Sequence, residues 1–134
     1  MNIALMAHDR KKELMVQFCI AYCGILAGHS ICATNTTGKL VAEATGLPVT
    51  RYLSCAQGGS QQIGARIAYN ELDLVFFFAD PSGKESLNSV WEICRLCDQH
   101  GIPFASNIAT AEVLIHGLQD GYLDWRDIVN PKNV

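Results

Sequence analysis

The sequence predicts an α/β domain of three layers, in which helices cover both faces of a central parallel sheet of about five strands. Strand-like runs alternate with helix-length amphipathic segments from residue 2 onward, and short connections join them, as in β-α units with right-handed crossovers. The run at residues 72–78 is almost wholly apolar, as expected of a central strand covered on both faces. With 134 residues the chain is long enough to bury a core as a single domain, residues 1–134.

The first half of the chain alternates three strands with two helices. Strands are expected at residues 2–7, 31–33 and 49–54, and helices at about 10–26 and from the turn at 34–38 to residue 46. Asp9 stands where an N-cap of the first helix is expected. Four side chains spaced by four residues give that helix a core-facing stripe: Leu14, Phe18, Tyr22 and Leu26. Gly46 is expected to end the second helix.

The second half of the chain continues the pattern. A loop at residues 55–60 leads into a helix at 61–69, and the apolar strand at 72–78 follows. A helix at 87–100 stops at Gly101 and Pro103, before a short strand at 104–105 and a helix at about 110–116. The tail at residues 120–134 contains Trp125 and Arg126, and we expect it to pack across the domain or against a neighbouring molecule.

Composition excludes several classes of protein. The net charge of −3 gives no broad basic surface, so we expect no nucleic-acid partner. No apolar run reaches the roughly 18–20 residues of a membrane span, so we expect no membrane partner. The N-terminus lacks the basic start and long apolar stretch of a signal peptide, which predicts a cytoplasmic protein.

The six cysteines are expected to be free thiols, since disulfides are rare in the cytoplasm. Cys94 and Cys97 form a C-x-x-C pair, but they share a helix face with Leu87 and Val90, so both are expected in the core. A redox pair would need an exposed helix start, and a zinc site would need two more ligands. We therefore expect neither a metal nor a cofactor.

Polar and small residues follow the strands at the edge where parallel sheets bind ligands. They are His8, Asp9 and Lys12 after the first strand, Thr34, Thr36 and Thr37 after the second, Ser54, Gly58 and Ser60 after the third, and Asp80 after the fourth. Hydroxyls, backbone N–H groups at a helix start and a lysine ammonium are the components of an anion site. Each group alone has an ordinary role as a helix cap, a surface lysine or a loop histidine. Their convergence on one edge predicts a phosphate site.

Several segments together resemble methylglyoxal synthase in order and spacing over nearly the whole chain. They are Ala7-His8-Asp9 with Lys12, Ala33-Thr34-Asn35-Thr36-Thr37-Gly38, Gly58-Gly59-Ser60-Gln61-Gln62-Ile63-Gly64, Phe76-Phe77-Phe78-Ala79-Asp80-Pro81, and Pro103-Phe104-Ala105-Ser106-Asn107 with Ala109-Thr110-Ala111-Glu112. The resemblance implies a Rossmann- or flavodoxin-like sheet and a homohexamer that eliminates phosphate from dihydroxyacetone phosphate to give methylglyoxal. Related domains are regulatory modules in carbamoyl phosphate synthetase.

The resemblance also assigns roles to residues. The implied phosphate-binding residues are Lys12, Thr34, Thr36, Thr37, Ser54 and Gly58. The implied catalytic positions, which line the site with polar groups, are His8, Asp9, Ser60 and Asp80.

The chain departs from the family at the positions that carry the chemistry. Ser60 stands where the family has the aspartate that removes the substrate proton, and a serine hydroxyl is far too weak a base without an activating partner. Residues 82–95 contain neither the histidine that helps to polarise the substrate carbonyl nor an aspartate, and this segment is one residue shorter than in the family. Cys55 replaces a glycine beside Ser54.

Three hypotheses follow. The chain is a weak or rewired enzyme of this family, a non-catalytic sensor of a phosphorylated metabolite, or an assembly component that has lost its ligand. The intact phosphate-binding set argues against the third. If the chain is an enzyme, a carboxylate from Asp9, Asp80 or Glu85 has to replace the missing base.

Overall fold

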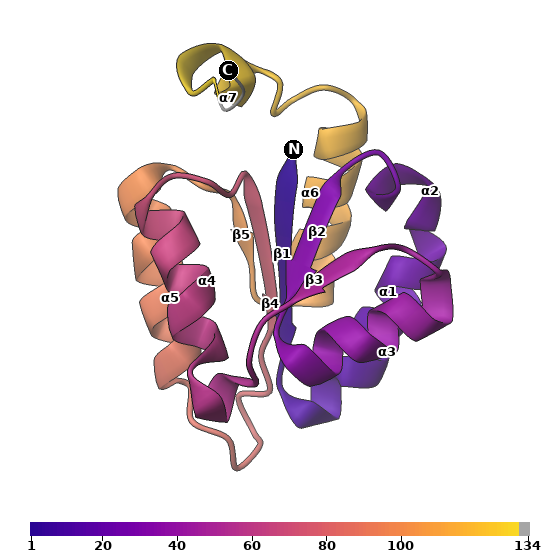
Figure 1. Ribbon diagram of the computed structural model, residues 1–134, viewed down its shortest axis with the longest axis vertical. Helices are drawn as coiled ribbons and strands as arrows, with labels where there is room; N and C mark the ends of the chain where they lie inside the picture. The colour runs from indigo at the N-terminus through magenta and orange to yellow at the C-terminus, as the bar shows by residue number, and fades with distance from the viewer. Residues whose placement is uncertain (132–134) are drawn as a thin grey trace.

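Five parallel strands form the central sheet of the computed structural model, which describes residues 1–131 (Figure 1). They are β1 (Asn2–Ala7), β2 (Ser30–Ala33), β3 (Val49–Arg51), β4 (Leu74–Phe78) and β5 (Phe104–Ala105). Their order across the sheet is β3-β2-β1-β4-β5, and every neighbouring pair is parallel. The predicted parallel sheet is confirmed.

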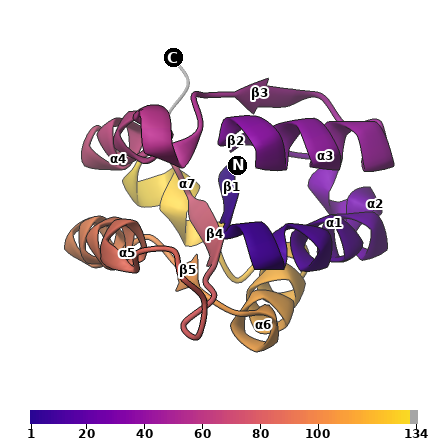
Figure 2. The ribbon, with the colours of Figure 1, turned by 90° about the horizontal axis from the view of Figure 1, so that it is seen from below.

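Helices cover both faces of this sheet, which confirms the predicted three layers (Figure 2). One face carries α1 (Lys12–Ala21), α2 (Cys23–Leu26), α3 (Asn35–Thr45) and α6 (Ile108–Gln119), and the other carries α4 (Gly59–Ala68) and α5 (Asn88–His100). Side chains alternate along the strands, so Phe76 and Phe78 of β4 enter the first layer and Phe77 enters the second. All three rings are buried, and burying such a side chain contributes about 1.5–3 kcal/mol.

The strand order reverses between β1 and β4. The chain runs outward from β1 through β2 to β3, returns to the other side of β1 as β4, and continues outward to β5. The connections that leave β1 and β4 therefore diverge. A crevice is therefore expected at the carboxyl edge of the sheet. This edge faces the viewer in Figure 2.

The region after β1 is not the continuous helix predicted at residues 10–26. It consists of the 3-10 turn η1 (Asp9–Lys11), then α1, then α2, with a break at Tyr22, whose backbone lies at φ −112° and ψ 24°. The Tyr22 ring packs 5.1 Å from the Phe18 ring and 5.4 Å from the His116 ring of α6, and its hydroxyl bonds to Glu112. These contacts with another helix override the local helical pattern.

The predicted capping role of Asp9 is also wrong. No side chain caps η1 or α1, because the Asp9 carboxylate instead accepts a hydrogen bond from Lys12 Nζ at 2.7 Å. The prediction for Gly46 is confirmed, since this residue ends α3 in the left-handed region at φ 75°. α3 itself starts at Asn35 with Thr34 as N-cap, so most of the predicted turn at 34–38 lies inside the helix.

The remaining boundaries differ by a few residues. β3 and β4 are shorter than the strands predicted at 49–54 and 72–78. α6 is longer than the helix predicted at 110–116, because the Asn107 side chain accepts a hydrogen bond from the Thr110 N–H at 3.0 Å and caps the helix earlier.

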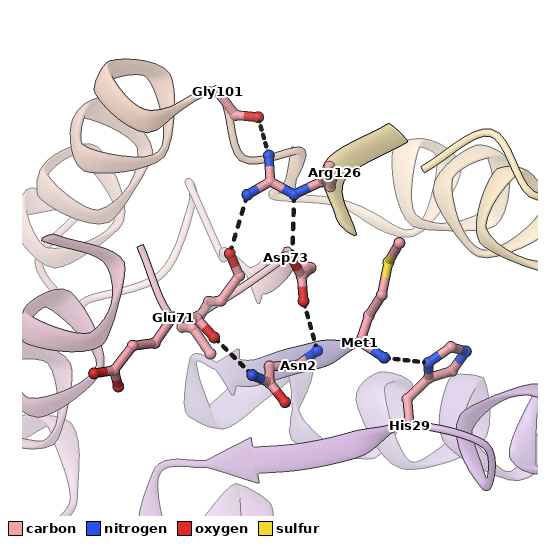
Figure 3. Close-up of polar contacts among 8 residues, drawn as sticks. Met1, Asn2, His29, Glu71, Asp73, Gly101 and Arg126 are labelled. Atoms are coloured by element: carbon pink, nitrogen blue, oxygen red, sulfur yellow. Dashed lines mark hydrogen bonds and ion pairs between the residues drawn. The ribbon is translucent and has the colours of Figure 1, made fainter. Parts of the chain in front are cut away.

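The predicted tail packs across the amino edge of the sheet, where it forms the short helix α7 (Trp125–Val129) (Figure 3). Arg126 is buried and pairs with the fully buried Asp73 at 3.3 Å. Its guanidinium also donates to the carbonyls of Gly101 at 2.6 Å and Leu72 at 3.3 Å. The Asn2 N–H donates to the second oxygen of Asp73 at 2.8 Å, so the tail is tied to both β1 and the start of β4. Residues 132–134 of the predicted tail lie outside the described residues.

All six cysteines are free thiols, as predicted. Cys97 is buried in the α4–α5 layer, but Cys94 is only half-buried, because a spacing of three residues places it at the margin of the apolar face. Within residues 1–131 no group of three or more His, Cys, Asp or Glu side chains is arranged to hold a metal ion. No helix of this part of the chain is long and apolar enough to cross a membrane.

Candidate functional site

A cavity of about 380 Å³ lies at the carboxyl edge of the sheet, where the strand order reverses. Its wall combines the ends of β1 and β4 with the start of α3 and with the loops after β3 and β4. The side chains of this wall that bear polar atoms are His8, Asp9, Lys12, Thr34, Thr36, Ser54, Cys55, Glu85, Ser86 and Ser89.

His8 is held rigidly at the end of β1. It is 5% exposed, and its Nδ1 accepts a hydrogen bond from the Asp80 N–H at 2.9 Å. The backbone N–H of His8 donates to the Phe78 carbonyl at 3.0 Å. The His8 and Phe77 rings pack edge to face, with their centroids 5.5 Å apart. Because Nδ1 is the acceptor, the proton of the neutral ring is on Nε2. His8 can therefore present a hydrogen-bond donor to a ligand.

Lys12 lies in the first turn of α1 and bends back over the end of β1. Its ammonium donates to the Ala7 carbonyl at 3.0 Å and to Asp9 at 2.7 Å, and the side chain is only 17% exposed. The hydrogen bond from Lys12, together with its charge, lowers the pKa of the Asp9 carboxyl. An ammonium has three donors, so Lys12 has one left for an anion in the cavity.

The start of α3 supplies hydroxyls and backbone donors. Thr34 and Thr36 line the cavity, and no side chain caps the first turn. The Asn35 N–H donates to the Leu53 carbonyl at 3.4 Å, which leaves the N–H groups of Thr36 and Thr37 for a ligand. Thr37 is 1% exposed, and its Oγ1 has no hydrogen-bond partner among the described residues. An unpaired buried hydroxyl costs about 1–3 kcal/mol. Such a group is typical of a site that a polar ligand completes.

The loop after β3 shapes another part of the wall. It contains the 3-10 turn η2 (Cys55–Gln57), followed by Gly58 in the left-handed region at φ 106°. A Cβ on Gly59 would lie 1.9 Å from the Leu53 carbonyl oxygen, so only glycine fits there. Ser54 and Cys55 face the cavity, and burial raises the pKa of the Cys55 thiol. Gly58 is not part of the cavity wall; it joins η2 to α4.

Asp80 stands behind His8 rather than in the cavity wall. It is 6% exposed, and its carboxylate accepts a hydrogen bond from the Ser82 hydroxyl at 3.2 Å. A Cβ on Gly83 would lie 2.3 Å from the second Asp80 oxygen, so the turn wraps closely around this carboxylate. In this position Asp80 orients the loop and, through its N–H, the His8 ring.

Ser60 faces a neighbouring cavity of about 370 Å³ between α4 and α5. The residue is 6% exposed, and its hydroxyl donates a hydrogen bond to Gln61 Oε1 at 3.2 Å. Ser89 lines both cavities, so the two are adjacent. Of the sequence-predicted residues, the first cavity is lined by His8, Asp9, Lys12, Thr34, Thr36 and Ser54, whereas Thr37, Gly58, Ser60 and Asp80 are not part of its wall.

The loop between β4 and α5 adds residues that sequence reasoning assigned no binding role. Glu85 and Ser86 of this loop line the cavity together with Ser89 of the first turn of α5, and the Asp9 N–H donates to Glu85 Oε2 at 2.6 Å. Among these, Glu85 had been named only as a possible substitute base. The signal for the two serines was their place after the fourth strand, at the same edge as the other polar residues.

An open parallel sheet with an anion-type cavity at its reversal point defines a small-molecule-binding α/β domain. Residues 15–106 of this chain match the family described as the MGS-like domain. The chain therefore belongs to the methylglyoxal-synthase-like domain family.

Relatives that match nearly the whole of this chain are named methylglyoxal synthase. The chain is 59% identical to methylglyoxal synthase of Caldicellulosiruptor saccharolyticus over 133 residues, which cover 98% of this chain and 94% of that protein. It is 54% identical to methylglyoxal synthase of Lysinibacillus sphaericus over 134 residues, covering 99% and 100% of the two chains. The crystal structure of methylglyoxal synthase from Elizabethkingia anophelis NUHP1 superposes with a TM-score of 0.81 at 34% identity, covering 99% of this chain and 91% of that one.

Proposed function

We propose that the chain binds a phosphorylated small molecule in the cavity and slowly eliminates phosphate from dihydroxyacetone phosphate to give methylglyoxal. The observation that carries the binding is the convergence of the Lys12 ammonium, the Thr34 and Thr36 hydroxyls and the start of α3 on one cavity. Together they match the charge and the acceptor oxygens of a phosphate group. The relatives are named methylglyoxal synthase, which supports methylglyoxal as the product.

The chemistry requires a proton to leave the hydroxyl-bearing carbon beside the carbonyl. The resulting enediolate then collapses: a carbonyl forms on that carbon, the bond between the far carbon and the phosphate oxygen breaks, and phosphate leaves with the electron pair. The enol that remains ketonises to methylglyoxal. A donor at the carbonyl oxygen stabilises the enediolate, and His8 Nε2 is suited to this role.

The slow rate is expected from the position of Ser60. A hydroxyl is a poor base, and this one faces the neighbouring cavity. Introducing an aspartate by Ser60→Asp is expected to leave turnover well below about 10 per second, a typical enzyme rate. The same observation favours the second candidate function, a non-catalytic sensor of a phosphorylated metabolite.

Calorimetry with inorganic phosphate and phosphoglycolate tests the binding. Wild type is expected to bind both ligands, and the Lys12→Ala/Thr37→Ala variant is expected to bind neither. Lys39→Ala, a change of an exposed lysine on the same α3, is the control for loss of one positive charge. No binding by wild type, or equal binding by the double variant, would refute the proposal.

A colorimetric assay of methylglyoxal then separates the slow enzyme from the sensor. Detectable turnover that the Lys12→Ala/Thr37→Ala variant lacks supports the enzyme. Binding without turnover supports the sensor. Assembly to a homohexamer remains a prediction, and light scattering that found only monomer would contradict it.

A further inference from the structure

Glu85 projects from the connection between β4 and α5 to the first turn of η1. Its Oε2 accepts the Asp9 N–H at 2.6 Å, a contact that joins residues 76 positions apart. Its other oxygen, Oε1, accepts no hydrogen bond from the described residues. The side chain lines the same cavity as His8 and Lys12. A carboxylate held by one oxygen and open at the other is suited to accept a proton.

The alternative carboxylates are less suitable. Asp9 also lines the cavity, but its carboxylate pairs with Lys12, which lowers the pKa of the Asp9 carboxyl and weakens it as a base. Asp80 is outside the cavity wall and is enclosed by Ser82 and Gly83. Among the described residues, Glu85 is the cavity carboxylate without a lysine partner.

We infer that the Glu85 carboxylate is the base that removes the substrate proton, in place of the aspartate that Ser60 replaces. This inference rests on the proposed function. Glu85 takes the proton from the hydroxyl-bearing carbon, and the C–H electron pair enters the enediolate. The proton of the hydroxyl on that carbon passes to the former carbonyl oxygen as phosphate departs. Glu85 then returns its proton to the departing phosphate, which leaves the carboxylate ready for another turnover.

The decisive variant is Glu85→Gln. The glutamine oxygen can still accept the Asp9 N–H, so the loop contact stays while the basic oxygen is lost. Turnover to methylglyoxal and exchange of the substrate carbon-bound proton with deuterated solvent are both expected to fall by about 100-fold or more. Calorimetric binding of inorganic phosphate is expected to remain within about threefold of wild type. Glu43→Gln, on the exposed side of α3, is the matched control and is expected to leave turnover, proton exchange and phosphate binding unchanged.

Chemical rescue separates a base from a residue that only holds the loop. Glu85→Ala leaves space for formate. Added formate is therefore expected to raise the turnover of Glu85→Ala several-fold and to leave the turnover of Glu85→Gln unchanged. A loss of rate that formate does not relieve, or a Glu85→Gln variant as active as wild type, overturns the inference. Wild type that binds phosphate but shows neither exchange nor turnover also overturns it and leaves ligand binding intact. Absence of phosphate binding by wild type is the distinct failure of the proposed function.

Discussion

The backbone N–H of Asp80 donates a hydrogen bond to Nδ1 of His8 at 2.9 Å, across 72 positions of sequence. The contact joins the ends of β1 and β4, the two strands between which the sheet order reverses. It fixes both the orientation of the imidazole and the nitrogen that carries its proton. The ring nitrogen of His8 that is left to donate, Nε2, is therefore set by a residue outside the cavity wall.

Replacing His8 by asparagine tests this arrangement. The asparagine oxygen can still accept the Asp80 N–H, but the variant has no donor at the position of Nε2. Turnover is expected to fall by about 10² to 10³, while phosphate binding changes little, because the donor acts on the carbonyl oxygen as charge develops there. Steady-state kinetics and calorimetry measure the two quantities. His100→Asn, at the end of α5, is the control, and equal losses of rate and binding would contradict the assigned role.

Phosphate is expected to protect Cys55 from alkylation. The Cys55 thiol lines the cavity beside Thr34 and Lys12, so a bound anion would cover it. Burial raises the pKa of this thiol, and because the thiolate is the nucleophile, the alkylation rate is expected to rise as the pH increases through the alkaline range. Mass spectrometry after iodoacetamide treatment at alkaline pH follows each site. Cys94, half-buried on α5 and away from the cavity, is the internal control, and protection of both cysteines alike would place the anion elsewhere.

Gly59→Ala is expected to disrupt the loop after β3. The added methyl would lie 1.9 Å from the Leu53 carbonyl oxygen, so the backbone has to move, at a cost of at least about 1–3 kcal/mol in the free energy of unfolding. Because Ser54 belongs to the same loop, phosphate binding should weaken as well. Gly24→Ala is the matched control, since its methyl meets nothing within 4 Å. In α2 that change should stabilise the protein by about 0.5–1 kcal/mol. Urea unfolding distinguishes the two variants.

Arg126→Met is expected to lower the free energy of unfolding by about 3–5 kcal/mol, because it removes the cation that faces the fully buried Asp73. Arg95→Met, which breaks an exposed pair with Glu92, should cost less than about 1 kcal/mol. Urea titrations of both variants measure the difference. Similar midpoints for the two would show that the buried pair contributes little. Phosphate binding by folded Arg126→Met should match wild type, since this pair lies at the amino edge of the sheet and the cavity at the carboxyl edge.

Sequence periodicity was sufficient for the strands and most helices, because apolar runs such as residues 72–78 report burial directly. The pattern failed to predict the break in the helix at Tyr22, where the side chain contacts α6. It also failed at Asp9, whose carboxylate accepts a hydrogen bond from Lys12 instead of capping the helix. The buried Arg126–Asp73 pair was not predictable, since neither residue has a local pattern that identifies the other.

For the site, the expectation that ligands bind at the carboxyl ends of parallel strands was sufficient to predict that residues from separate loops lie at one edge of the sheet. It could not show that Ser60 points between α4 and α5, or that Glu85 reaches Asp9, because side-chain direction in a loop depends on packing.

Phe77 belongs to two parts of the molecule. Its ring packs with the α4–α5 layer of the core, meets the edge of His8 and forms part of the cavity wall. This part of the cavity wall therefore belongs to the close-packed core. A small change of side-chain volume in the core would be transmitted to the shape of the cavity. Selection at this position acts on folding and on ligand geometry at once, and a tolerated replacement has to satisfy both. Adaptation of the site to another ligand is therefore less constrained in the loop between β4 and α5, where the exposed Ser86 can change without altering the interior.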